Sequence, residues 1–201
     1  MVFVDTTVMI PTTIPFVSEV AKQFGWNLRI LRPKTTFWEQ AERKGMPHIR
    51  RRWCCYGLKL QPIFDFVRQL PPQRGEVIGI RGDEVDRLSS PQQVKYDKRR
   101  GINAWFYLPL FDWTKKHVLR YIKEHHLPMP PHYRLGLKET CMCGTFSSKR
   151  QIEILRGQFP NLFQKFVELE GKFRWDWACF YDRKPLYAKE LAKQKTLERW
   201  F

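Results

Sequence analysis

The feature that most constrains the fold is a strand, helix and strand pattern near the start of the chain. Residues 1–5 form a β-branched and aromatic run that ends at an acid. Between residues 14 and 24, apolar side chains recur every three or four positions, as they do on one face of a helix, and Gly25 follows as a stop signal. Residues 27–32 give a second short strand. This spacing predicts a βαβ unit with a parallel sheet and a right-handed crossover.

Helices and strands continue to alternate along the chain. Apolar periodicity predicts helices over residues 37–44 and 58–70, and residues 76–80 predict the next strand. The polar and basic stretch 89–104 contains a proline, so we expect a mobile loop there. Further helices are predicted over 112–124 with Asp112 as the cap, over 149–156 with Gly157 as the stop, and over 161–170.

This alternation predicts the α/β class, with a Rossmann-like parallel sheet and helices on both of its faces. We expect a core over residues 1–145 and a helical C-terminal extension over residues 146–201. In open parallel sheets, ligands bind beyond the carboxyl ends of the strands. Asp5 and Arg81 each follow a strand-like run, which makes both candidates for binding residues.

The chain is strongly basic. Its 36 Lys and Arg residues against 20 Asp and Glu give a net charge of +16, which favours anionic partners such as nucleotides, sulfate esters or RNA. Two basic runs, Arg50–Arg52 and Lys98–Arg100, fit nucleic-acid binding and fit a solvated surface equally well. Apolar stretches are too short for a membrane span, and the acid at position 5 comes too early for a signal peptide. We therefore expect a cytoplasmic protein with no membrane association.

Five cysteines, an odd number, argue against a disulfide framework and favour thiol or metal chemistry. Four of them form two tight groups, Cys54-Cys55 and Cys141-Met142-Cys143. Thiolates are the soft ligands that hold iron-sulfur clusters, and a set of four is common. Cys54, Cys55, Cys141 and Cys143 are therefore predicted to bind a [4Fe-4S] cluster, with zinc or free redox thiols as alternatives. The remaining cysteine, Cys179, is predicted to be a buried structural residue.

Five short motifs follow one another along the chain: Val2–Thr6 before Pro11–Thr13, Cys54-Cys55 before Leu58-Lys59 and Pro62, Gly79–Glu84 with Arg87, Pro109-Leu110 with Trp113, and Tyr133 with Gly136. In this order they resemble the phosphoadenylyl-sulfate (PAPS) reductase family, a branch of the PP-loop ATP pyrophosphatase superfamily. The resemblance covers most of the chain. It implies an adenine nucleotide alpha-hydrolase-like fold that binds its nucleotide at the carboxyl edge of the sheet.

The resemblance also implies roles for single residues. Asp5, Lys59, Arg81 and Arg87 would contact an adenine nucleotide or adenylyl sulfate, with the two arginines on the phosphosulfate, because guanidinium groups suit oxyanions. The alternatives are a turn acid for Asp5, a solvated helix residue for Lys59, and surface ion pairs for the arginines.

Two family segments do not occur in this sequence. The Ser-Gly-Gly-Lys-Asp-Ser phosphate loop, which sits on the family's first strand and helix, is absent, as is the Glu-Cys-Gly segment that carries the nucleophilic cysteine. We expect either a truncated sequence or a subunit to which another chain supplies the PP-loop. The second cysteine group is also Cys-x-Cys, where the family's cluster-bearing members have Cys-x-x-Cys.

The implied function is reduction of nucleotide-bound sulfate to sulfite in sulfur assimilation, with a dithiol such as thioredoxin as the reductant. No catalytic residue is identified. One alternative is a PP-loop sulfurtransferase that modifies tRNA or DNA with the help of an iron-sulfur cluster, a reading that the positive charge favours. Another is a non-catalytic subunit that bears a cluster or acts as a scaffold.

Overall fold

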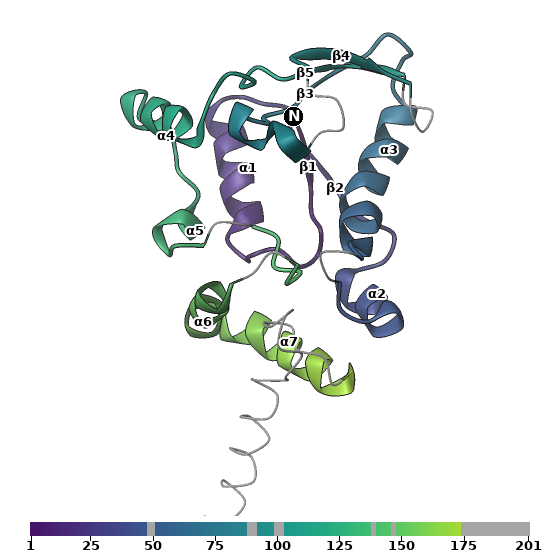
Figure 1. Ribbon diagram of the computed structural model, residues 1–201, viewed down its shortest axis with the longest axis vertical. Coiled ribbons are helices and arrows are strands. Elements are labelled where there is room, and N and C mark those ends of the chain that lie inside the picture. The colour runs from purple at the N-terminus through teal and green to yellow at the C-terminus, as the bar shows by residue number, and fades with distance from the viewer. Residues whose placement is uncertain (48–50, 88–91, 99–102, 138–139, 146–147, 174–201) are drawn as a thin grey trace, which may run out of the picture. The chain divides into compact units, whose positions relative to one another are not determined.

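The protein has an α/β fold, as predicted. The computed structural model describes residues 1–47, 51–87, 92–98, 103–137, 140–145 and 148–173. They belong to two compact units: unit 1 comprises residues 1–62 and 130–201, and unit 2 comprises residues 63–129 (Figure 1). In the described ranges, no helix combines the length and the apolar character needed to cross a membrane.

Unit 1 contains the predicted βαβ pattern. Strand β1 (Val2–Val4) is followed by helix α1 (Thr13–Gln23) and strand β2 (Arg29–Leu31). The two strands pair in parallel along all three of their residues, which confirms the predicted orientation. Gly25 has a φ of +64°, a left-handed conformation that glycine adopts at little cost just after a helix.

The other helices of unit 1 follow the apolar periodicity of the sequence. Helix α2 spans Phe37–Lys44, as predicted, and the π-helix η1 spans Cys55–Leu60. Helices α5 (Pro131–Arg134), α6 (Lys149–Gln158) and α7 (Pro160–Phe173) complete the unit. The expected stop at Gly157 was wrong, because α6 runs through that glycine to Gln158 and Phe159 forms its C-cap. A single glycine costs a helix only about 1 kcal/mol, which buried neighbours on the same helix offset.

One hydrophobic core holds unit 1 together and includes two of the candidate cysteines. Its fully buried side chains come from the loop after β1, from α2, from η1 and from the two helices α6 and α7. Cys54 and Cys143 are 3% and 5% exposed and belong to this core. Its other members include Val8, Ile10, Phe37, Leu58, Met142, Ile152, Leu155 and Phe166.

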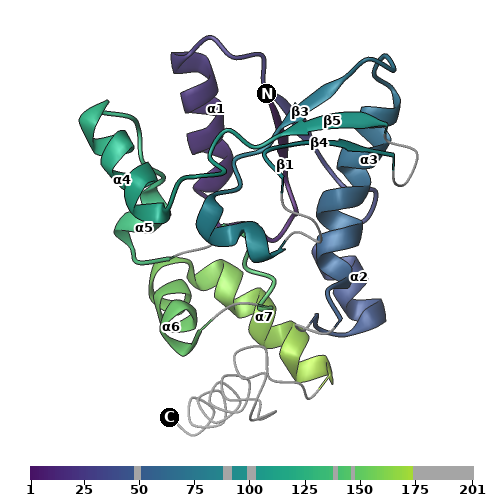
Figure 2. The same ribbon diagram turned by 45° about the horizontal axis from the view of Figure 1, so that its top comes forward.

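Unit 2 is a small mixed sheet with a helix packed on one face (Figure 2). Helix α3 (Gln61–Arg68) begins at the end of unit 1 and leads into the elements of unit 2, which are β3 (Gly75–Val77), the 3-10 helix η2 (Gly82–Arg87), β4 (Val94–Asp97), β5 (Ala104–Tyr107) and α4 (Lys115–Glu124). The strand order is β3-β5-β4, in which β3 is parallel and β4 antiparallel to β5. Residues of α3 pack against Ala104 and Phe106 of β5.

The expectation of a loop over residues 89–104 was wrong for residues 94–97 and 104, which belong to β4 and β5, while residues 89–91 and 99–102 lie outside the described residues. Charge and proline content suggested the loop, yet Val94 and Tyr96 alternate with polar neighbours in the period-two pattern of a strand. The sheet of unit 2 is consequently mixed and not wholly parallel. The prediction that Asp112 caps the next helix was also wrong. Thr114 is the N-cap of α4, and Asp112 lies two residues before it.

Gly82 joins two of the sequence motifs of unit 2. Its backbone N–H donates hydrogen bonds to the carbonyl oxygens of Trp113, at 2.8 Å, and Leu110, at 3.2 Å. A Cβ atom at this position would lie 2.4 Å from the carbonyl oxygen of Phe111, closer than atoms can approach. The Gly79–Glu84 motif therefore requires glycine at this point in order to pack against the segment before α4.

Replacing Gly82 by alanine is expected to lower the free energy of unfolding by about 1–3 kcal/mol, because the methyl group forces two backbone segments apart. Gly79→Ala is the matched control, since a Cβ atom there meets nothing within 4 Å. Urea denaturation of both variants measures the difference. Equal stability of Gly82→Ala and Gly79→Ala would contradict the packing described above.

Candidate functional site

The second cysteine group is held by the loop that follows β1. Met9 and Cys141 form an antiparallel bridge. The N–H of Ile10 donates to the carbonyl of Thr140 and the N–H of Met142 donates to the carbonyl of Val8, each at 2.9 Å. Because Val8, Ile10 and Met142 are buried in the core of unit 1, this short pairing fixes the backbone on both sides of Cys141.

The first cysteine group is held by its neighbours along the chain. Trp53 stacks on Phe37 with ring centroids 5.6 Å apart, and its indole N–H donates to the carbonyl oxygen of Gly45 at 3.2 Å. Four residues after Cys54, Leu58 is fully buried in the core. These anchors on both sides of the cysteine pair fix the start of η1 against the core.

The structure brings the two cysteine groups together inside unit 1. Cys143 is hydrogen-bonded to Cys141 and Cys54, and Cys54 is also hydrogen-bonded to Cys55. Among the described residues, no three or more His, Cys, Asp or Glu side chains form a group that could hold a metal ion. The hydrogen bonds thus link the four sulfur atoms in the order Cys141, Cys143, Cys54 and Cys55, called here the thiol series. Their role as ligands stays a prediction.

Within the thiol series, two cysteines donate hydrogen bonds as thiols and the other two accept them as thiolates. Hydrogen bonds from Cys141 and Cys54 lower the pKa of Cys143 to about 3. A hydrogen bond from Cys54 lowers the pKa of Cys55 to about 7, although burial acts in the opposite direction. The pKa values of Cys54 and Cys141 are raised, chiefly because each shares its proton with Cys143. Cys143 and Cys55 are therefore the two positions that favour thiolate.

Two threonine hydroxyl groups touch the thiol series. Thr145, 4% exposed, places its Oγ1 3.3 Å from Cys143 Sγ and 3.9 Å from Cys54 Sγ. A thiolate has no proton to donate, so the hydroxyl of Thr145 is the donor to Cys143 when that residue is ionised. Thr6 Oγ1 donates to Cys141 Sγ at 3.6 Å. Sequence reasoning missed both threonines, and only the position of Thr145 two residues after Cys143 could have suggested one of them.

Lys59, predicted to bind nucleotide, lies beside the thiols. It is exposed on η1, four residues after Cys55, and its positive charge lowers the pKa of Cys55 together with that of Arg52. The described contact of Lys59 is therefore electrostatic and directed at a thiolate. Its proposed contact with a nucleotide stays a prediction.

Asp5, at the carboxyl end of β1, holds a turn. Its Oδ1 accepts a hydrogen bond from the N–H of Thr7 at 2.8 Å, and its Oδ2 accepts one from Nε of Arg32 at 3.0 Å. Thr7 has a φ of +61°, an unusual conformation for a β-branched residue, and its Oγ1 accepts a hydrogen bond from the N–H of Phe37 at 2.7 Å. Asp5 thus stabilises the turn that leads from β1 toward the loop beside Cys141.

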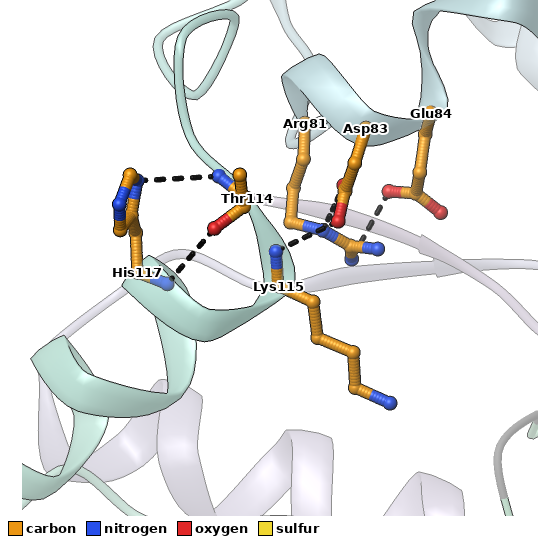
Figure 3. Close-up of polar contacts among 6 residues, drawn as sticks. All are labelled: Arg81, Asp83, Glu84, Thr114, Lys115 and His117. Atoms are coloured by element: carbon orange, nitrogen blue, oxygen red, sulfur yellow. Dashed lines mark hydrogen bonds and ion pairs between the residues drawn. The ribbon is translucent and has the colours of Figure 1, made fainter.

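Arg81, in unit 2, is held by two carboxylates of its own segment (Figure 3). Its Nε lies 2.8 Å from Asp83 Oδ1 and its Nη1 lies 3.0 Å from Glu84 Oε2. Asp83 also accepts a hydrogen bond through Oδ2 from the backbone N–H of Lys115 at 2.8 Å, and this bond is the main reason why the pKa of Asp83 is lowered. Arg87 ends η2, and its side chain lies outside the described residues.

The first turn of α4 is built around these contacts, as Figure 3 shows. Thr114 Oγ1 accepts a hydrogen bond from the N–H of His117, and the N–H of Thr114 donates to His117 Nδ1, both at 3.4 Å. Asp83 adds a carboxylate at the next N–H, where the helix dipole favours negative charge. Arg81 is therefore linked through Asp83 to the start of α4.

In the reduced, metal-free protein, Cys55 is expected to react with iodoacetamide at a rate that rises through an inflection near pH 7, because its thiolate is the nucleophile. Lys59→Gln should move the inflection to higher pH, since a positive charge near the thiolate is lost. Lys22→Gln, at an exposed lysine on α1, is the matched control. Peptide mass spectrometry measures the rate at each cysteine, and an inflection at the ordinary thiol value of about 8.5 would contradict the prediction.

Thr145→Val is expected to lower the free energy of unfolding of the reduced, metal-free protein by about 1.5–3 kcal/mol, because a buried thiolate loses a hydrogen-bond donor. Thr145→Ser keeps the hydroxyl group and should lose only the contribution of a methyl group. Anaerobic urea denaturation compares the two. A serine variant as unstable as the valine variant would show that the hydroxyl contributes nothing.

Comparisons with known proteins agree with the motifs. The chain is 28% identical over 180 residues to an uncharacterized protein of Methanocaldococcus jannaschii, covering 88% of this chain and 42% of that protein. It is 26% identical over 136 residues to an adenosine 5′-phosphosulfate reductase of Salinibacter ruber, covering 67% of this chain and 52% of the reductase. The chain thus spans about half or less of the length of these relatives.

The fold is also similar to a solved structure, the phosphate complex of phosphoadenylyl-sulfate (PAPS) reductase from Candida auris. The TM-score is 0.53 at 22% sequence identity, and the match covers 69% of this chain and 66% of the other. The family model for the phosphoadenosine phosphosulfate reductase domain matches residues 1–179. With the order of the motifs and the α/β architecture already established, this match shows that the chain belongs to the phosphoadenosine phosphosulfate reductase domain family.

Proposed function

We propose that the chain is the core of an adenylyl-sulfate reductase, and that Cys54, Cys55, Cys141 and Cys143 hold a [4Fe-4S] cluster in it. The observation that carries this proposal is the thiol series of unit 1. Two segments that lie far apart in the sequence place four sulfur atoms in one chain of hydrogen bonds, and two of these sulfurs already favour thiolate.

Four thiolates are the usual ligand set of a [4Fe-4S] cluster, and they are also a ligand set of structural zinc. In the proposed site these ligands are Cys54, Cys55, Cys141 and Cys143, and the iron and sulfide content distinguishes the two metals. A [4Fe-4S] cluster takes its four thiolates at separate irons and supplies a redox-active centre when bound. Hydroxyl and cationic groups beside the sulfurs, namely Thr6, Thr145, Arg52 and Lys59, stabilise the negative charge that four thiolates bring.

In the proposed reaction, sulfate bound to an adenine nucleotide accepts two electrons. The bond between its sulfur and the bridging oxygen breaks, and sulfite and the nucleotide leave. A dithiol reductant such as thioredoxin becomes a disulfide and releases two protons, which balances the step. In this proposal Arg81 and Arg87 contact the phosphosulfate, so the substrate must displace Asp83 and Glu84 from the Arg81 guanidinium.

The cluster is tested by anaerobic reconstitution with iron and sulfide. We expect about four irons and four sulfides per chain, with a visible thiolate-to-iron absorption band. Each of Cys54→Ser, Cys55→Ser, Cys141→Ser and Cys143→Ser should reduce the iron content strongly, whereas Cys179→Ser should not. A colourless protein that binds one zinc ion through the same four residues would contradict the cluster.

The reaction is tested separately, on a protein that also contains the PP-loop segment, by measuring sulfite released from adenylyl sulfate and from its 3′-phosphorylated form in the presence of reduced thioredoxin. Arg87→Gln should reduce sulfite release, and Arg120→Gln, an exposed arginine paired with Glu124 on α4, is the control. A protein that holds the cluster yet binds neither nucleotide and releases no sulfite would overturn the reductase function and leave the cluster site standing.

A further inference from the structure

The turn that carries the second cysteine group directs hydrogen-bond donors at its own sulfur atoms. The backbone N–H of Cys143 donates to Cys141 Sγ, and the backbone N–H of Thr145 donates to Cys143 Sγ. Each donor lies two residues after the sulfur that it contacts. Gly144, between Cys143 and Thr145, has a φ of +85°, a left-handed conformation that favours glycine. The backbone of this turn therefore provides an N–H group for each of its two sulfurs.

Thr145 adds a side-chain hydroxyl group to the same turn. Its Oγ1 lies 3.3 Å from Cys143 Sγ and 3.9 Å from Cys54 Sγ, so it contacts one sulfur from each cysteine group. Thr145 is 4% exposed, and bulk water therefore has little access to this hydroxyl group. The residue thus offers two hydrogen-bond donors, one from the backbone and one from the side chain, to the sulfurs of the proposed cluster site.

The donors of Thr145 differ from the thiol donors in what they can do beside a cluster. A cysteine that ligates iron is a thiolate, which can accept hydrogen bonds and cannot donate them. When Cys54 and Cys141 ligate, they therefore lose the protons that they donate to Cys143. The N–H and O–H of Thr145 keep their protons. The hydroxyl group has only one, and the shorter distance assigns it to Cys143.

A donor to a ligand sulfur acts differently on the two oxidation states of a cluster. Reduction adds an electron, and part of its negative charge resides on the ligand sulfurs. A hydrogen bond to such a sulfur therefore stabilises the reduced state more than the oxidised state, and hydrogen bonds of this kind help to set the reduction potential. Burial strengthens the effect, because the surroundings of Thr145 screen charge less than water does.

We propose that Thr145 raises the reduction potential of the cluster by donating a hydrogen bond from its hydroxyl group to the ligand sulfur of Cys143. Thr145 acts through Cys143 and is therefore a positioning residue. This inference rests on the proposed [4Fe-4S] site and adds to it a residue outside the set of four ligands.

The test is a potentiometric titration with dithionite of the full chain, reconstituted anaerobically with iron and sulfide and followed by electron paramagnetic resonance. Thr145→Val keeps the backbone N–H and the shape of the side chain and removes the hydroxyl group. We expect the ratio of reduced to oxidised cluster at a given potential to fall by about 3- to 10-fold. For one electron this is a shift of about 30–60 mV to lower potential, at about 59 mV per tenfold.

Two further variants separate the hydroxyl group from packing. Thr145→Ser retains the hydroxyl group and should have a potential close to that of the parent. Thr13→Val is the matched control, because Thr13 is 3% exposed in unit 1 and its Oγ1 has no hydrogen-bond partner among the described residues. It should leave the potential unchanged. Iron and sulfide are counted in every variant, so that equally loaded proteins are compared.

Thr145→Ala is the second variant without a hydroxyl group, and it should lower the potential as Thr145→Val does. Unchanged potentials in both variants would overturn the inference and leave the cluster site standing. If both variants take up no iron while Thr145→Ser does, the hydroxyl group serves to retain the cluster, and its role in the potential is overturned. A parent protein that takes up no iron and sulfide would refute the proposed cluster, and the inference with it.

Discussion

The candidate site of unit 1 depends on a short piece of backbone pairing. The loop after β1 and the segment 140–142 exchange hydrogen bonds on both sides of the bridge between Met9 and Cys141. Buried side chains on each partner, Val8, Ile10 and Met142, exclude water from this pairing and make its loss costly. Without it, the second cysteine group would have no fixed position relative to Cys54, and the thiol series would not form.

Once the sulfurs are buried side by side, their protonation becomes a shared property. A thiolate in the core is unfavourable unless hydrogen bonds and positive charges compensate for the lost water. Cys143 receives hydrogen bonds from two cysteines and from Thr145, whereas Cys55 has one cysteine donor and the charges of Arg52 and Lys59. The more deeply buried thiolate is therefore stabilised by several hydrogen bonds. The thiolate nearer the solvent is stabilised first by one hydrogen bond, from Cys54, and then by the charges of Arg52 and Lys59.

Sequence reasoning found the parts of the fold that depend on local pattern. The βαβ unit and α2 follow from periodicity and stop signals, and the two cysteine groups stand out by spacing alone. Strand β4 was missed because its short alternation of Val94 and Tyr96 with charged residues is masked by the basic composition around it. Thr6 could not be found, because its hydroxyl contacts the sulfur of Cys141, 135 residues away, and this contact depends on the tertiary pairing. Thr145 lies only two residues after Cys143, but the sequence alone does not show that its hydroxyl contacts that sulfur. The same holds for Asp83, whose role at the start of α4 joins residues 32 positions apart.

The contacts of Arg81 are compatible both with a structural role, as an ion pair, and with the proposed role in substrate binding. Two carboxylates hold its guanidinium in ion pairs that are partly exposed to solvent, which limits their contribution to stability. What the pair does provide is orientation, because Asp83 is itself fixed by the backbone of α4 and Gly82 locks the same segment against Phe111. An anion that reaches Arg81 then exchanges one set of oxygen acceptors for another, and the arginine loses little conformational freedom in the exchange. In the proposed function, the ion pair and the phosphosulfate contact would thus be alternative contacts of the same positioned side chain.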